Sequence, residues 1–178
     1  MKAMPTPIPV PHHQKGVALL VSLILLVVMT LLGLAGIRAI TQEERMAGQA
    51  FDRSIAFQAA EAALREIEAA VETNKPEPAS GTGCNLVGAI MSCSLPGTAD
   101  TPRWENTSFA SWQAATPVSS GVLTVTPEYF VEYLGNTFAC QPGSASDTMN
   151  CKRYRITART AGSAGRASVV LQSLYATD

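Results

Sequence analysis

Cysteine is the residue type in this sequence whose number and spacing most clearly indicate chemistry. Among the 178 residues are four cysteines: Cys84, Cys93, Cys140 and Cys151. No two of them have the Cys-x-x-Cys spacing typical of a zinc site. An even number of cysteines in an exported domain predicts two disulfides, and three pairings are open. We favour Cys84 with Cys93 and Cys140 with Cys151, because each pair would close a short loop rich in turn-forming residues. We expect each bridge to stabilise the domain by about 2–4 kcal/mol.

The two histidines, His12 and His13, both precede a long apolar segment. If that N-terminal stretch is removed as a leader, the remaining chain has no histidine for general-base catalysis, activation of a nucleophile or metal binding. The sequence also has no glycine-rich phosphate loop after a strand and no nucleophile-elbow motif. Adjacent Glu43 and Glu44 are interpreted as solvated charges on a helix. The sequence therefore predicts that the protein is not an enzyme and uses no cofactor or metal.

A basic and aromatic cluster near the C-terminus is the feature that would suit nucleic-acid binding. It comprises Lys152, Arg153, Tyr154, Arg155, Arg159 and Arg166. Such clusters can contact phosphates and stack on bases. Removal of Lys2 and Lys15 with a leader would leave 11 basic against 14 acidic residues, a net charge of -3. We interpret the cluster as the solvent face of a strand, and nucleic-acid binding as the less favoured alternative.

Two smaller groups of residues have a functional and a structural interpretation. Trp104, Phe109 and Trp112 could form an adhesive patch, but large aromatic side chains usually cover a core, so partial burial against a sheet is favoured. Asp147 and Asn150 could contribute to a calcium site, but two oxygen donors are too few. Turn formation accounts for them instead.

Residues 17–38 are predicted to form a membrane-spanning helix. The 22 residues from Gly16 to Ile37 carry no charge, and at about 1.5 Å per residue a helix of this length reaches roughly 30 Å, enough to cross a bilayer. Lys2 and Lys15 favour a cytoplasmic N-terminus, although Arg38 weakens that bias. The apolar residues expected in the membrane include Leu19, Leu20, Val21, Leu23, Leu25, Leu26 and Leu31.

Residues 1–16 are predicted to be a leader peptide, because their composition changes abruptly at Gly16 and they include four prolines. A conventional signal peptide has a shorter apolar core of about 7–15 residues and a small-residue cleavage site. Gly33-Leu34-Ala35 could imitate such a site. A secreted binding protein with a conventional signal peptide is therefore a distant alternative.

Residues 39–73 are predicted to continue the same helix as an amphipathic half. Phe57, Ala60, Leu64, Ile67 and Val71 recur at steps of three and four residues, as expected for one buried helical face. Prolines soon after residue 74 would stop the helix. A helix from residue 17 to about 72 would be roughly 80 Å long, so its outer half must pack against another element.

The remaining residues, 74–178, are predicted to form a globular head. Residues 74–121 are expected to be a loop region with one short element around Trp104 to Gln113, because Gly, Pro, Ser and Thr dominate there. A β-sheet is expected over residues 122–176, with strands at Val122–Thr126, Glu128–Leu134, Lys152–Thr160 and Arg166–Tyr175. In the third strand Tyr154, Ile156 and Ala158 alternate with Arg153, Arg155, Thr157 and Arg159. This alternation predicts one buried and one solvent-exposed face. The expected fold is α+β, with the long helix packed on a four-stranded antiparallel sheet.

This combination of features resembles a type IV pilin with a class III signal sequence. The residues Lys15-Gly16-Val17-Ala18-Leu19-Leu20-Val21 resemble a prepilin peptidase site. Residues 42–68, QEERMAGQAFDRSIAFQAAEAALREIE, and residues 154–175, YRITARTAGSAGRASVVLQSLY, closely resemble the PilX-type minor pilins. No resemblance covers residues 74–135. The resemblance implies cleavage after Gly16, N-methylation of Val17, and a role in a priming or tip complex that supports pilus extension, twitching motility and adhesion.

The resemblance also implies partners and a location. The expected partners are prepilin peptidase, other minor pilins, the major pilin and the inner-membrane assembly machinery. The expected location is the inner membrane with a periplasmic head, and the pilus fibre or tip after assembly. Most pilins have a glutamate at the fifth position of the mature chain, where this sequence has Val21. The K-type pseudopilin of type II secretion shares this absence and sits at a tip, so by analogy Val21 favours a tip or initiation position. A minor pseudopilin of a type II secretion system, which has the same architecture and serves protein export, is the nearer alternative.

Overall fold

The computed structural model describes residues 16–79, 83–141, 143, 147, 149–161 and 166–177. Within these residues the chain forms one helix followed by eight strands. It divides into two compact units, residues 1–47 and residues 48–178, each of which is described by itself. Apart from Gly16, the predicted leader lies outside the described residues.

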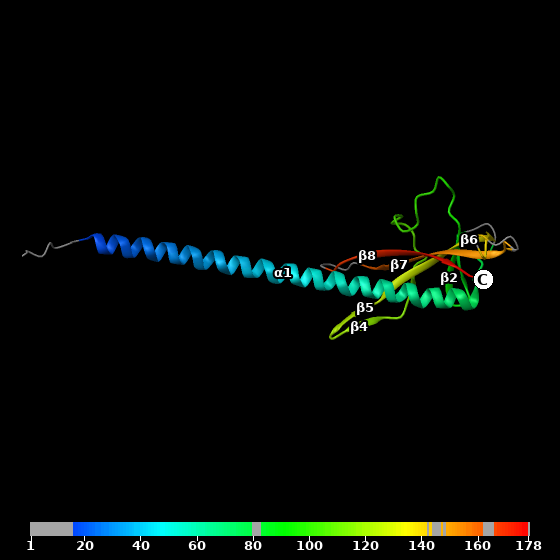
Figure 1. The fold of residues 1–178 in the computed structure, drawn as a ribbon, viewed down its shortest axis with the longest axis horizontal. Helices are drawn as coiled ribbons and strands as arrows, with labels where there is room; N and C mark the ends of the chain where they lie inside the picture. Colours follow the sequence, from blue (N-terminus) through cyan, green and yellow to red (C-terminus); the bar gives the residue numbers. More distant parts are fainter. Residues whose placement is uncertain are drawn as a thin grey trace, which may run out of the picture. The chain divides into compact units, whose positions relative to one another are not determined.

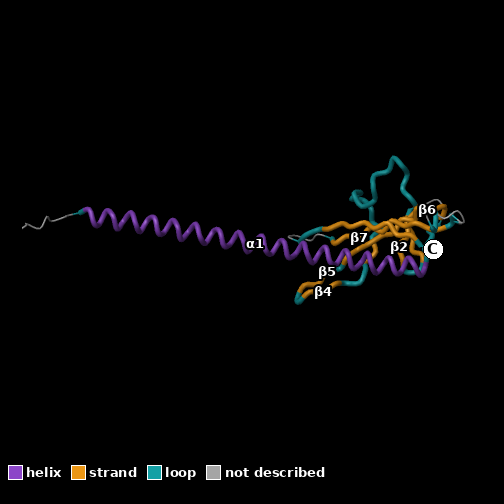
Figure 2. The backbone as a smooth tube through the Cα atoms, viewed as in Figure 1, coloured by secondary structure: helices purple, strands orange, loops and turns teal. Residues whose placement is uncertain are grey.

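Helix α1 runs from Val17 to Asn74, in agreement with the predicted long helix (Figures 1 and 2). It ends where the amide of Lys75 donates to the carbonyl of Val71 at 2.8 Å. Lys75 has a positive φ of 42° and Pro76 follows it, so the chain turns out of the helix and cannot re-enter it. In the first unit, every described residue of α1 is exposed.

In the second unit α1 buries one face against a sheet. Its buried residues are Ile55, Ala56, Ala59, Ala60, Ala63, Leu64, Ile67 and Val71. The predicted face is correct except at Phe57, which is exposed. Each residue advances about 100° around a helix, so Phe57 lies beside the alanine stripe rather than on it. Alanines make up half of this buried face, while Leu64, Ile67 and Val71 fill the core.

The large sheet has six strands and a mixed topology, so the predicted four-stranded antiparallel sheet is wrong. Its main path is β1 (Cys84–Val87), β2 (Ile90–Ser94), β6 (Pro127–Phe138), β7 (Cys151–Thr160) and β8 (Val169–Ala176), and β3 (Gln113–Ala114) pairs with β6. β2 and β6 pair in parallel, whereas the other pairs are antiparallel.

The loop expected over residues 74–121 contains four strands instead. β1 and β2 form a hairpin around Gly88, whose φ of 64° suits a tight turn. Neither strand has the alternating β-branched pattern that predicts strands from sequence, because small and polar residues make up much of both. β2 also pairs in parallel with a strand more than thirty residues away in sequence, and local propensity carries no signal of such contacts.

The first predicted strand, Val122–Thr126, does not join the large sheet. Its central residues form β5 (Leu123–Val125), which pairs with β4 (Val118–Ser120) in a separate hairpin (Figure 1). The turn consists of Gly121 and Val122, and Gly121 has a positive φ of 62°. A two-residue turn pairs the flanking residues locally, so β5 is held by β4.

The two faces of the large sheet are covered by different elements. On the face toward α1, Tyr154, Ile156 and Ala158 are fully buried, as predicted. On the other face lies the segment between β2 and β3, drawn in green in Figure 1, on the side of the sheet away from α1. Phe109 and Trp112 belong to this segment and pack edge-on against Phe130, with ring centroids 4.9 and 4.8 Å away. The second face is therefore only partly exposed to solvent. Thr157, which was predicted to face solvent, is buried.

Candidate assembly site

The predicted processing residues lie at the first turn of α1. Gly16 has a φ of 102°, a conformation that favours glycine, and the helix begins at the next residue, Val17. The amide of Leu20 donates to the carbonyl of Gly16 at 3.4 Å. Both Gly16 and Val17 are exposed. The peptide bond between them joins a non-helical glycine to the first residue of the helix.

The apolar half of α1 is long and apolar enough to cross a membrane, judged by length and composition. All of the predicted membrane-facing residues are exposed in this unit: Leu19, Leu20, Val21, Leu23, Leu25, Leu26 and Leu31. The hydroxyl groups of Ser22 and Thr30 donate to the carbonyls of Leu19 and Val27, so these polar groups are satisfied within the helix. That arrangement suits a lipid environment, where unpaired polar groups are costly.

In the second unit, acidic side chains of α1 bind residues in or next to the strands. The contacts are Asp52 with Arg166 and the amide of Ala167, Glu66 with Thr116, Glu68 with Ser173, and Glu72 with Tyr175. None of these contacts was predicted from the sequence, because the partners lie far from α1 in the chain. The spacing of Glu68 and Glu72, one helical turn apart, was the available signal.

Asp52 makes two of these contacts, one with each carboxylate oxygen. Its carboxylate accepts a hydrogen bond from the amide of Ala167 at 2.5 Å and one from Nε of Arg166 at 2.5 Å. The bond from Ala167, supported by the nearby Arg166 charge, holds the pKa of Asp52 below its usual value, although burial opposes the shift. Asp52 is thus a charged link between α1 and the segment that leads into β8.

The predicted basic cluster is largely compensated by carboxylates. Lys152 pairs with Glu77, Arg155 with Glu132, Arg159 with Glu128, and Arg166 with Asp52. Arg159 also lies over the ring of Trp112 at 3.8 Å. A cluster whose charges are already paired offers little to phosphates. This arrangement weakens the nucleic-acid interpretation.

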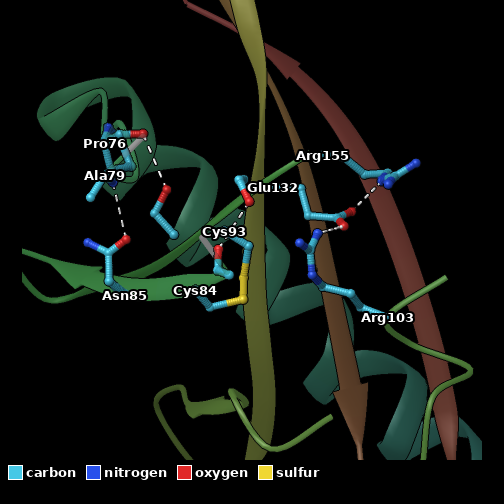
Figure 3. The surroundings of a disulfide bond; sticks show 11 residues. Pro76, Ala79, Cys84, Asn85, Cys93, Arg103, Glu132 and Arg155 are labelled. Carbon is cyan, nitrogen blue, oxygen red and sulfur yellow. Dashed lines mark hydrogen bonds and ion pairs between the residues drawn. A yellow bond between two sulfur atoms is a disulfide. The ribbon is translucent and has the colours of Figure 1, made fainter. Parts of the chain in front are cut away.

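Glu132 is the buried centre of a charge triad on the face of the sheet away from α1. Its two carboxylate oxygens accept from Nη1 of Arg103 at 2.5 Å and from Nε of Arg155 at 2.6 Å (Figure 3). The side chain of Glu132 is only 2% exposed. Arg103 belongs to the segment between β2 and β3, so the triad ties that segment to β6 and β7. Sequence analysis did not identify it, because the three residues are far apart in the chain.

The structure joins Cys84 to Cys93 and Cys140 to Cys151, the pairs that the sequence favoured. The first bridge connects β1 to β2 beside the end of α1 (Figure 3). There the side chain of Ser92 donates to the carbonyl of Pro76, and the amide of Ala79 donates to Asn85. The bridge closes the hairpin itself, and the two hydrogen bonds connect the hairpin to the residues that follow α1.

The second bridge closes a turn organised by Asp147. The Asp147 carboxylate accepts hydrogen bonds from the amides of Cys140, Gln141 and Met149. This supports the interpretation of Asp147 as a turn residue. Among the described residues, no group of three or more His, Cys, Asp or Glu side chains is placed to hold a metal ion.

Tyr154 contributes an unsatisfied polar group to the core. Its ring lies 5.5 Å from that of Tyr133, and its hydroxyl is buried without a hydrogen-bond partner among the described residues. Burial raises the pKa of Tyr154 well above its usual value. Tyr129, by contrast, donates its hydroxyl proton to the carbonyl of Ala89 at 3.2 Å.

Comparison with known protein families accounts for most of the chain. The PilX N-terminal family matches residues 15–65, and the family of the type IV pilus assembly protein PilX C-terminal region matches residues 68–177. Neither a curated protein nor a solved structure matches the chain. The two family matches meet within α1 and together include the apolar helix, the acidic contacts and both disulfides. The chain therefore belongs to the PilX family of type IV pilus assembly proteins.

Proposed function

We propose that this chain is a minor pilin that acts in a priming or tip complex of a type IV pilus and supports piliation, twitching motility and adhesion. The observation that supports the proposal is the match of both parts of the chain to PilX families. The first half of α1 is also apolar and exposed, as a membrane anchor requires. The family consists of structural pilus components, which assigns the chain a role in assembly rather than catalysis.

Prepilin peptidase would cleave between Gly16 and Val17. The non-helical glycine before the first helical turn supports this position, because cleavage there would leave the helix intact. The new N-terminus, Val17, would then be methylated. Residues 17–38 would hold the subunit in the inner membrane, with the head in the periplasm, until the assembly machinery extracts it. In the fibre the same apolar surface would pack against the helices of other minor pilins and the major pilin.

Val21 supports a place at the tip. A glutamate at the fifth position of the mature chain can attract the N-terminal amine of a neighbouring subunit, and a valine cannot. A subunit at the end of a fibre has one neighbour fewer, so it can dispense with that attraction. The two disulfides and the paired charges of the second unit suit a head that is exposed outside the cell.

The N-terminal sequence and intact mass of the protein from native membranes test the proposal. We expect the mature chain to begin at Val17, with a methyl group. A Gly16→Leu variant should retain the leader, whereas Ala35→Leu, which blocks a conventional cleavage site, should be processed normally. A mature chain that begins near Gly36 would make the protein a freely secreted domain and would overturn the proposal.

Deletion of the gene, scored for surface pili and for protein secretion, tests the choice of machinery. We expect a loss of pili and twitching that the wild-type chain restores. A secretion defect with normal pili would instead assign the chain to a type II secretion system. Immunogold labelling tests the position, since a tip subunit is labelled at fibre ends and a shaft subunit along the whole fibre.

A further inference from the structure

β8 is the last strand of the large sheet and has one open edge. In the described part of the chain it pairs with β7 and with no other strand. The amide of Thr177 donates to the carbonyl of Lys152 across this pair. In an antiparallel pair every second residue bonds to the neighbour. The amides and carbonyls of Val170, Gln172 and Leu174 therefore point away from the sheet.

This edge lacks the features that usually protect an exposed strand. The eight residues of β8, VVLQSLYA, contain no charge and no proline, and their register with β7 has no bulge. Natural proteins commonly place such features on open edges to prevent unwanted pairing. The opposite edge strand, β1, has four residues and is bridged by a disulfide. β8 is thus the edge at which another strand can add to the sheet.

Two hollows border β8. One, of about 240 Å³, is lined by Trp104, Val170 and Gln172. The other, of about 260 Å³, has Leu134, Phe138, Arg153 and Leu174 among its lining residues. Leu174 is 76% exposed. Val170 and Leu174 are four residues apart on the same face, so the hollows are spaced for residues j and j+4 of an adjacent strand, about 13 Å.

Arg153 gives the second hollow a positive charge. It donates to the carbonyl of Ala139 at 2.9 Å and lies over the ring of Phe138. Its neighbours on the same face of β7, Arg155 and Arg159, each pair with a carboxylate. Among the described residues no carboxylate pairs with Arg153. A ligand that fills this hollow is therefore expected to bring an acidic group.

We propose that the edge of β8 binds an extended segment from the head of another pilus subunit, which adds to the sheet as a further strand. The segment has apolar side chains at j and j+4 for the two hollows, and an Asp or Glu beside Arg153. Backbone hydrogen bonds provide affinity and the hollows provide specificity, as in other cases of strand addition. A second copy of β8 has Val170 and Leu174 at the right spacing but supplies no carboxylate between Val169 and Ala176. The identity of the partner as a pilus subunit rests on the proposed function.

Binding of a designed peptide to the full chain in detergent tests the inference. The probe is an acetylated and amidated ten-residue peptide of mostly threonine, with valine at j, leucine at j+4 and an aspartate beyond the leucine. The control peptide has the same composition with the apolar residues three apart, on opposite faces of a strand. Hydrogen exchange of single amides is the readout. We expect the probe, and not the control, to protect the amides of Val170, Gln172 and Leu174.

Substitution of Gln172 distinguishes binding by strand addition from nonspecific hydrophobic binding of the peptide. Gln172→Pro removes an outward amide that the sheet does not use, and Gln172→Val retains it. Both variants lose the side-chain bond from Gln172 to Thr157. We expect the proline to weaken peptide binding at least about tenfold and the valine to change it no more than about twofold. Equal binding by both variants would overturn strand addition.

Arg153→Gln tests the acidic group without disturbing the edge. For the probe with aspartate we expect binding about fivefold weaker, and for the same peptide with asparagine almost no change. A peptide that fails to bind the folded wild-type chain would overturn the inference. Dimerisation of the chain that competes with the probe would also overturn it, in favour of a second copy. Neither result would alter the cleavage and piliation tests, so this inference can fail while the proposed function stands.

Discussion

Replacement of Glu132 by glutamine is expected to destabilise the head more than any other loss of a single charge on the sheet. The change preserves the shape of the side chain and removes the charge that holds Arg103 and Arg155. Glu132 is almost completely buried, and both of its oxygens accept a charged donor. The amide of a glutamine would place an N–H group against one guanidinium. Two positive charges would then lose their partner at the centre of the sheet.

The magnitude follows from the two hydrogen bonds. A hydrogen bond to a charged group contributes about 1.5–3 kcal/mol, and loss of one partner of a buried ion pair costs about 3–5 kcal/mol. Arg155 is one-third exposed, so water can solvate it after the change. We therefore expect Glu132→Gln to lower the free energy of unfolding by about 3 kcal/mol, a large part of the usual 5–15 kcal/mol. The melting temperature should fall by roughly 10 °C.

Urea unfolding of the full chain in mild detergent measures this change, with tryptophan fluorescence as the signal. Trp112 lies against Phe130 and Arg159, so its emission should report the loss of packing on this face. Glu61→Gln is the matched control. Glu61 pairs with Arg65 at the same 2.5 Å, but these side chains are 42% and 75% exposed. An exposed pair one helical turn apart is worth only about 0.3–0.5 kcal/mol.

A double-mutant cycle identifies the source of the loss. In an Arg103→Met background, the effect of Glu132→Gln should decrease by at least about 1 kcal/mol, because one of the two pairs is already absent. A loss no larger than that of Glu61→Gln would refute the reasoning. It would mean that water screens the triad as it does a surface pair.

Three further changes test other features of the head. Tyr154→Phe removes a buried hydroxyl that has no partner and should raise the free energy of unfolding by about 1 kcal/mol in urea unfolding; a loss of stability would show that the hydroxyl is bonded in solution. Asp52→Asn should destabilise the chain at neutral pH. Because the folded pKa of Asp52 is depressed, its contribution is present above the unfolded pKa of about 4 and is lost as the pH falls through the folded value, so melting curves of variant and wild type should converge in acid. Replacement of Cys84 and Cys93 by serine should cost about 3 kcal/mol under oxidising conditions, and an unchanged melting temperature would contradict the assigned stabilising role of this bridge.

Local sequence patterns predict the elements whose cause is local. The extent of α1 follows from the uncharged run that starts at Gly16 and from the prolines that follow Asn74. The alternation around Ile156 predicted the strand and its core-facing side, since a strand has a period of two. The short loops between the cysteines predicted the disulfide pairing seen in the structure, because closing a short loop costs little conformational entropy.

Features that depend on distant residues arise from the packing of the whole fold and have no local sequence signal. The parallel pairing of β2 with β6 and the exposure of Phe57 follow from which elements meet in space. The triad at Glu132 unites three segments of the chain, and the acids of α1 find their partners more than forty residues away. A carboxylate has the same local sequence signal whether water or an arginine faces it. The difference arises from the packing that removes water around it, which is a property of the whole fold.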